Sequence, residues 1–180
     1  MTSAGSLPTI NFPTRYLPGT TANFVSNEVY VTGLTAAQVW PLLVVPERWA
    51  SYYDGASDIT FPDNDGPQLR EGMRFWFTPF KLAPLRTVIS ELVSPGDGRP
   101  ARLSWAGQME QDGKLVIDAM HGFLIQDLPD GRLRLLTQES ERGPAAKQVA
   151  SEHSASLLAA HQSWLEGLVS AARAAGPASA

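Results

Sequence analysis

Residues 145–175 read AAKQVASEHSASLLAAHQSWLEGLVSAARAA, and this stretch decides the fold. Ala and Leu dominate it, and both have high helix propensity, so it predicts one long helix from about Ala145 to Ala175. On a helical wheel of about 3.6 residues per turn, apolar residues gather on one side and polar residues on the other. The apolar side comprises Leu157, His161, Trp164, Leu165, Leu168 and Ala172. A helix with such a side needs an apolar surface to cover.

The chain before this helix supplies that surface as a sheet. Apolar and polar residues alternate with period two, and clusters of Gly, Pro, Asp and Asn separate the runs. Connections of only a few residues favour antiparallel hairpins. The predicted strands are 24–31, 57–61, 72–80, 85–93, 101–108, 115–128 and 132–140.

Two short helices are predicted between the first strand and the second. Thr35 is typical of an N-cap for a helix that runs through Val44. Pro46 suits the first position of another helix that ends near Asp54. The order of elements therefore predicts an α+β fold, in which a curved seven-stranded antiparallel sheet wraps around the long C-terminal helix.

Length and composition narrow the classes of function. The chain has 180 residues and a net charge of −4 at pH 7, which suits a single acidic domain. It has no run of Lys and Arg, so we expect no nucleic-acid partner and no anionic membrane as a partner. It has no Cys, which excludes disulfides, thiolate metal sites and a Cys nucleophile.

The two ends differ in composition from the middle of the chain. We expect an N-terminal arm over 1–22, a single domain over 23–175 and a frayed tail over 176–180. The N-terminus has neither the basic nor the apolar part of a signal peptide, and no apolar run reaches the ~20 residues of a membrane span. We therefore expect a cytoplasmic monomer or homodimer.

Three ionisable side chains are predicted to point into the space between sheet and helix. In strand 132–140, Arg134 is expected to face water, which places Glu139 on the inner face with Leu133, Leu135 and Thr137. In strand 115–128, His121 shares the inner face with Ala119, Phe123 and Ile125. His161 lies on the apolar side of the helix. Buried ionisable groups of this kind gather at functional sites.

These groups allow two interpretations. His121 and His161 are candidate acid/base residues with Glu139 to orient them, or they are core histidines bonded to each other, to Glu139 or to the backbone. Glu139 could instead pair with Arg142 or Arg134. One of Tyr52 and Tyr53 is expected to face inward. The candidate ligand-binding residues are Trp40, Tyr52, Tyr53, Phe75, Phe77, Trp105, Phe123, Leu157, Trp164 and Leu168. No metal-ligand motif or phosphate-binding loop occurs, so no metal and no cofactor are expected.

Several short stretches resemble the START-like helix-grip (SRPBCC) superfamily, and within it the bacterial polyketide cyclase/dehydratase branch. The resemblance covers roughly residues 24–172. It rests on 39–40 with 46–49, on 70–75, on 102–105, on His121-Gly122-Phe123 and on 139–143.

The resemblance implies a helix-grip fold with a cavity for a hydrophobic or aromatic small molecule. It implies a cyclase/dehydratase-like enzyme of secondary metabolism that promotes cyclisation or dehydration by acid/base catalysis. The alternative is a non-catalytic binding or carrier protein for a lipid or aromatic metabolite, since proteins of one fold serve many functions.

Overall fold

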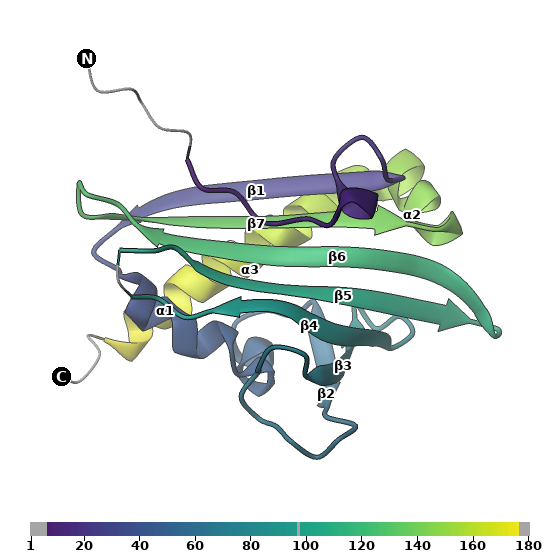
Figure 1. Ribbon diagram of the computed structural model, residues 1–180, viewed down its shortest axis with the longest axis horizontal. Helices are drawn as coiled ribbons and strands as arrows, with labels where there is room; N and C mark the ends of the chain where they lie inside the picture. The colour runs from purple at the N-terminus through teal and green to yellow at the C-terminus, as the bar shows by residue number, and fades with distance from the viewer. Residues whose placement is uncertain (1–6, 97, 177–180) are drawn as a thin grey trace.

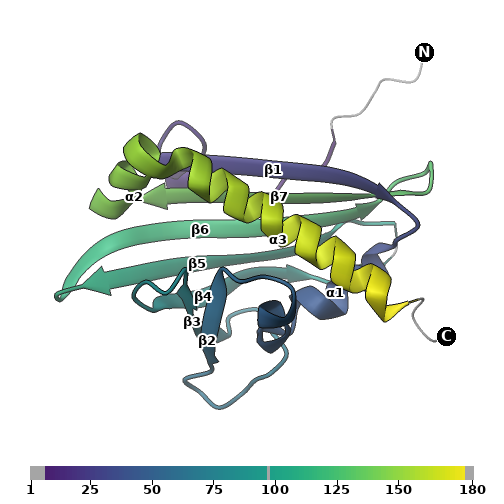
Figure 2. The same ribbon diagram turned by 180° about the vertical axis from the view of Figure 1, so that it is seen from behind.

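A computed structural model of the protein describes residues 7–96 and 98–176. It contains one seven-stranded antiparallel sheet, and the long helix α3 (Ser154–Ala175) lies across one of its faces (Figures 1 and 2). The strands are β1 (Asn23–Thr32), β2 (Ala56–Thr60), β3 (Arg74–Pro79), β4 (Leu85–Val93), β5 (Ala101–Gln111), β6 (Lys114–Asp127) and β7 (Arg132–Arg142). Their order across the sheet is β1-β7-β6-β5-β4-β3-β2. The predicted α+β helix-grip fold is thereby confirmed.

The two short helices follow β1, as predicted. Helix α1 (Ala36–Leu43) begins after Thr35, whose backbone N–H donates to Oε1 of Gln38 at 2.9 Å in a capping box. The 3₁₀ turn η2 (Pro46–Ser51) begins at the predicted proline. These elements connect β1, at one edge of the sheet, to β2 at the other edge.

A tight turn joins the two long central strands β5 and β6. Its residues Asp112 and Gly113 both have positive φ, 52° and 70°, as a two-residue hairpin turn requires. Pairing continues into β7, where His121 of β6 stands directly opposite Glu139. The register therefore brings two of the three predicted ionisable residues together on one face.

The predicted C-terminal helical segment is confirmed over Pro144–Ala175, but a π-helical turn interrupts its regular α-helical geometry. Helix α2 (Pro144–Gln148) passes into a π-helical turn, η3 (Val149–His153), before α3 begins. No Pro or Gly between residues 145 and 153 marks the interruption, and the Ala-rich sequence alone favours an unbroken helix. Only α3 forms the long cover of the sheet (Figure 2).

The part of the N-terminal arm that the structure describes packs on the face of the sheet turned away from α3 (Figure 1). Ile10 is buried there against Leu124 and Leu136. A Cβ atom on Gly122 would lie 2.5 Å from Cγ2 of Ile10, so the arm occupies the space of a missing side chain. Residues 1–6 of the predicted arm and 177–180 of the predicted tail lie outside the described residues.

The arm also explains why one prediction of exposure is wrong. Arg134 was expected to face water, but only 5% of it is exposed. It forms an ion pair with Glu28, and its Nη1 donates to the carbonyl oxygen of Pro8 at 2.7 Å. The alternation of β7 is as predicted, because Arg134 lies on the outer face, and the arm covers that face.

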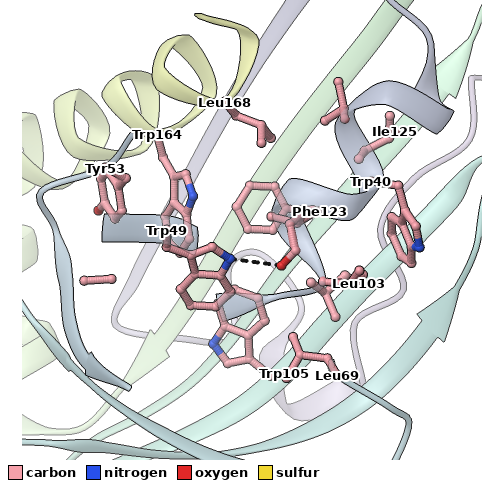
Figure 3. Packing of buried hydrophobic residues seen from close by; sticks show 14 of the residues in the cluster. Trp40, Trp49, Tyr53, Leu69, Leu103, Trp105, Phe123, Ile125, Trp164 and Leu168 are labelled. Atoms are coloured by element: carbon pink, nitrogen blue, oxygen red, sulfur yellow. Dashed lines mark hydrogen bonds between the residues drawn. The ribbon is translucent and has the colours of Figure 1, made fainter. Parts of the chain in front are cut away.

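Aromatic side chains fill most of the space between α3 and the sheet (Figure 3). Trp49 stacks on Trp105 with ring centroids 5.6 Å apart and meets the edge of Trp164 at 5.1 Å. Its Nε1 donates to the carbonyl oxygen of Leu43 at 2.9 Å. The centre of the fold is therefore a solid core, and any cavity must lie toward one end of it.

No helix within residues 7–96 and 98–176 is both long enough and apolar enough to cross a membrane.

Candidate functional site

A cavity of about 100 Å³ lies between α3, the inner face of the sheet and the residues after η2. Apolar side chains form most of its wall. Its ionisable residues are His121 of β6, Glu139 and Glu141 of β7, His161 of α3 and Tyr53. The cavity thus brings together all three predicted catalytic candidates from three separate elements.

His161 and Glu139 form a hydrogen-bonded pair across the helix and the sheet. Nε2 of His161 lies 2.9 Å from Oε2 of Glu139. Burial alone would raise the pKa of the Glu139 carboxyl, but the hydrogen bond from His161 favours the carboxylate, and this pKa lies below its ordinary value. The carboxylate therefore accepts the Nε2–H of His161, and in a neutral imidazole the lone pair then lies on Nδ1. Nδ1 is buried and has no hydrogen-bond partner among the described residues.

His121 packs against His161 and is held in the neutral form. The two rings are parallel within 5° and their centroids are 4.7 Å apart. Thr137 donates its hydroxyl proton to the carbonyl oxygen of Gly122 at 3.2 Å, so at 2.8 Å it accepts the Nε2–H of His121. Burial lowers the pKa of His121 to about 3. His121 is therefore a packing partner and a hydrogen-bonding group at neutral pH.

Glu141 is a second carboxyl in the cavity wall, two residues beyond Glu139 on the same face of β7. It is 5% exposed, and its Oε2 accepts a hydrogen bond from Nδ2 of Asn23 at 2.7 Å. Burial, with the charge of Glu139 beside it, raises the pKa of Glu141 to about 8. Two neighbouring carboxyls thus differ in charge at neutral pH.

Tyr53, rather than Tyr52, faces the cavity. Its ring stacks on Trp164 at 4.2 Å with 12° between the planes (Figure 3). A Cβ atom on Gly55 would lie 2.2 Å from the Tyr53 hydroxyl oxygen, so only glycine leaves room for this ring position. The Tyr52 hydroxyl donates to the carbonyl oxygen of Leu42 at 3.0 Å. Burial holds the pKa of Tyr53 far above its ordinary value, so it remains a neutral donor.

The predicted ligand-binding residues divide into two groups. Those in the cavity wall are Tyr53, Phe77, Leu157 and Trp164. Those packed elsewhere in the core or under α1 are Trp40, Tyr52, Phe75, Trp105, Phe123 and Leu168. The residues of the second group do not line the cavity, because their side chains fill the centre of the fold.

The three catalytic candidates are also residue types that bind divalent metals. Ligand atoms of His121, Glu139 and His161 all lie within 4.8 Å of one another. A metal ion lies in the ring plane of each histidine that binds it. The two imidazoles are stacked face to face, so their in-plane lone pairs do not converge on one point. The arrangement suits stacking and hydrogen bonding better than a shared ion.

The sequence interpretation missed Glu141 because the predicted strand ended at Ser140. The structure extends β7 to Arg142. Period-two alternation from Glu139 would have placed Glu141 on the inner face, had the strand been continued by two residues. Apolar wall residues that were missed include Phe80, Leu82, Met109 and Ile117.

Comparisons with known proteins support the fold more than the chemistry. No protein-family model matches the chain, and no curated protein matches it. DynU16, a protein of the dynemicin biosynthetic locus, has a TM-score of 0.56 and 15% identity over 81% of this chain and 45% of that chain. The di-domain ARO/CYC protein BexL from the BE-7585A biosynthetic pathway has a TM-score of 0.57 and 10% identity over the same shares. At these identities the likeness is one of fold.

A solved structure with much higher identity is hypothetical protein jhp0584 from Helicobacter pylori. It has a TM-score of 0.86 and 34% identity, covering 93% of this chain and 98% of that chain. Similarity of this extent spans the sheet, the short helices and the C-terminal helix together. The chain therefore belongs to the same protein family as jhp0584 of Helicobacter pylori.

Proposed function

We propose that the protein is a cyclase/dehydratase-like enzyme that acts on a small hydrophobic carbonyl compound by proton transfer. The observation that carries this proposal is His161, a buried histidine in a cavity wall. One of its nitrogens is bonded to Glu139, and the other has no partner in the described parts of the chain. A buried polar atom without a partner calls for an explanation, and a bound substrate supplies one.

The pair has the arrangement of a general base with an orienting carboxylate. Glu139 fixes the ring and keeps the proton on Nε2, so Nδ1 carries the lone pair that accepts a proton. The negative charge of Glu139 stabilises the imidazolium that forms. Such a base can remove a proton from a carbon next to a carbonyl group, which is the first step of both cyclisation and dehydration.

The dimensions of the cavity support a small substrate or the reacting part of a larger one. Its volume of about 100 Å³ is below the roughly 300–1,000 Å³ of typical ligand pockets. An outer hollow of about 160 Å³ shares Phe80, Val149 and Leu157 with the cavity, so a longer apolar molecule could extend into it. A stored lipid is a poor match to this volume, which disfavours a carrier. The biosynthetic settings of DynU16 and BexL agree with a cyclase-like role.

The experiment is incubation of the protein with a panel of small ketones, aromatic polyketides and fatty acids. Native mass spectrometry detects what is bound, and chromatography identifies what is released. A released molecule of changed mass or changed retention supports the enzyme. Tight retention of an unaltered ligand contradicts it and indicates a carrier.

A further inference from the structure

The cavity wall holds a buried acid that the proposed base does not need. Glu141 lies in the wall, 5% exposed, and the structure gives it a hydrogen bond from Asn23. No salt bridge reaches Glu141 in the part of the chain that the structure describes. Leaving a carboxyl inside an apolar wall without a cation is costly, so its position points to a role at the site.

We propose that Glu141 is the proton donor of this site and that the reaction is dehydration of β-hydroxy carbonyl compounds. The inference rests on the proposed function, because an eliminated hydroxyl needs an acid only where a base removes the other proton. It extends that function by naming the second catalytic residue and the class of substrate.

The positions of the two groups suit an elimination. Glu141 and Glu139 are alternate residues on the inner face of β7, and Glu139 is bonded to the base, His161. Acid and base therefore line the same small cavity from a strand and from the helix that covers it. Both groups are therefore available to a substrate that occupies the cavity.

The step balances in atoms and electrons. Nδ1 of His161 takes the proton from the carbon next to the carbonyl, and the electron pair of that C–H bond forms the new C=C bond. The C–O bond of the β-hydroxyl breaks, and its oxygen takes the proton of the Glu141 carboxyl and leaves as water. The imidazolium of His161 and the carboxylate of Glu141 then return to their starting forms by net transfer of one proton.

Four other titratable groups share this wall, and they explain why Glu141 suits the task. Glu139 is ionised and bonded to His161, which acts as the base. His121 is neutral with a pKa of about 3, so it has no proton to spare for a leaving hydroxyl. Tyr53 holds its proton too strongly, because burial raises its pKa far above neutrality. The pKa of Glu141, about 8, is near the operating pH that favours a general acid.

The test compares two probes that differ by one hydroxyl group. Diacetone alcohol is a β-hydroxy ketone that can lose water to give mesityl oxide. Methyl isobutyl ketone lacks the hydroxyl and can only exchange its acidic hydrogens with deuterium from solvent. Exchange reports the base alone, whereas formation of mesityl oxide reports base and acid together.

Glu141→Gln is the central variant, since an amide of the same shape can form hydrogen bonds but cannot give up a proton. We expect this variant to exchange deuterium into methyl isobutyl ketone at the wild-type rate. Its rate of mesityl oxide formation should fall by about 100-fold or more. Glu110→Gln, which removes an exposed carboxyl paired with Arg86, is the matched control and leaves both rates unchanged.

Dehydration by Glu141→Gln at the wild-type rate would overturn the inference, and so would exchange without dehydration in the wild-type protein. Absence of exchange in the wild-type protein contradicts the proposed base instead. In that case carbon-13 NMR of the Glu141 carboxyl, assigned with Glu141→Gln, decides the inference. An ionised carboxyl at neutral pH overturns it, and a protonated one supports a proton donor at this position.

Discussion

Nε2 of His161 on α3 lies 2.9 Å from Oε2 of Glu139 on β7. The hydrogen bond ties the covering helix to the sheet inside the cavity wall. It also fixes which ring nitrogen of His161 carries the proton. The same contact therefore sets the position of the helix at this point and the chemistry available to the site.

Replacing the carboxylate of Glu139 tests its charge. Glu139→Gln keeps the size of the side chain and can still accept from His161, but it cannot stabilise an imidazolium. We expect turnover of any substrate found in the panel to fall about 100-fold. Glu152→Gln removes an exposed carboxyl from η3 and should leave turnover unchanged. Equal turnover in Glu139→Gln and the wild-type protein would mean that the charge of Glu139 plays no part.

The raised pKa of Glu141 predicts a specific pH dependence of stability. Between pH 4.5 and about 8 the folded protein keeps a proton on Glu141 that the unfolded chain has lost. The free energy of unfolding therefore falls as pH rises through this window, by at most about 1.4 kcal/mol per unit of pKa difference. Glu141→Gln should lack this decline, and urea unfolding of both proteins across the window measures it.

The stability measurement needs a control variant that removes a carboxyl from the surface and leaves the buried carboxyl of Glu141 in place. Glu110→Gln removes a surface carboxyl and should retain the decline of the wild-type protein. Parallel stability curves for the wild type and Glu141→Gln would show that Glu141 titrates in the same range in both states.

Gly167 allows the close approach of α3 that positions Tyr53. A Cβ atom at Gly167 would lie 2.0 Å from the backbone oxygen of Tyr52. Gly167→Ala should therefore destabilise the protein by about 1–3 kcal/mol, although alanine favours helices by about 1 kcal/mol. Ser163→Ala on the exposed side of α3 is the control and should change stability little. A more stable Gly167→Ala protein would refute the close approach.

The arm should contribute to stability without taking part in the site. Ile10 packs on Leu124 and Leu136 on the face opposite the cavity. Ile10→Ala should lower the free energy of unfolding by about 2 kcal/mol, and Leu7→Ala, at a half-exposed position of the same arm, should lower it by less than about 0.5 kcal/mol. Turnover per folded molecule should be unchanged in both. Loss of turnover in Ile10→Ala would instead indicate that the arm controls the cavity.

The fold could be predicted because its signals are local. Each signal is contained in a short stretch of sequence. Examples are the period-two alternation in each strand, turn residues such as Asp112 and Gly113, and the apolar side of α3. The interruption at η3 had no such signal, since an Ala-rich stretch favours a regular helix. Burial of Arg134 could not be read from β7 alone, because it depends on an arm more than a hundred residues away in sequence.

Three polar residues of the cavity wall could be predicted, whereas Glu141 and the volume of the cavity could not. His121, Glu139 and His161 followed from periodicity, since each lies on the inner face of its element. Whether Trp105 and Phe123 line a cavity or fill the core depends on how their rings pack against Trp49 and Trp164, and sequence does not contain that information. The aromatic side chains fill the centre, and the cavity lies toward the end that holds Glu141 and Phe80.

The most direct test of the central claim is the rate of deuterium incorporation from heavy water into methyl isobutyl ketone, measured by mass spectrometry. The account predicts that the wild-type protein accelerates incorporation above the buffer rate. His161→Ala should return it to the buffer rate while circular dichroism shows a folded protein, and His153→Ala, an exposed histidine, should match the wild type. Incorporation by His161→Ala at the wild-type rate, or none by the wild-type protein, would contradict a proton-transfer site at His161.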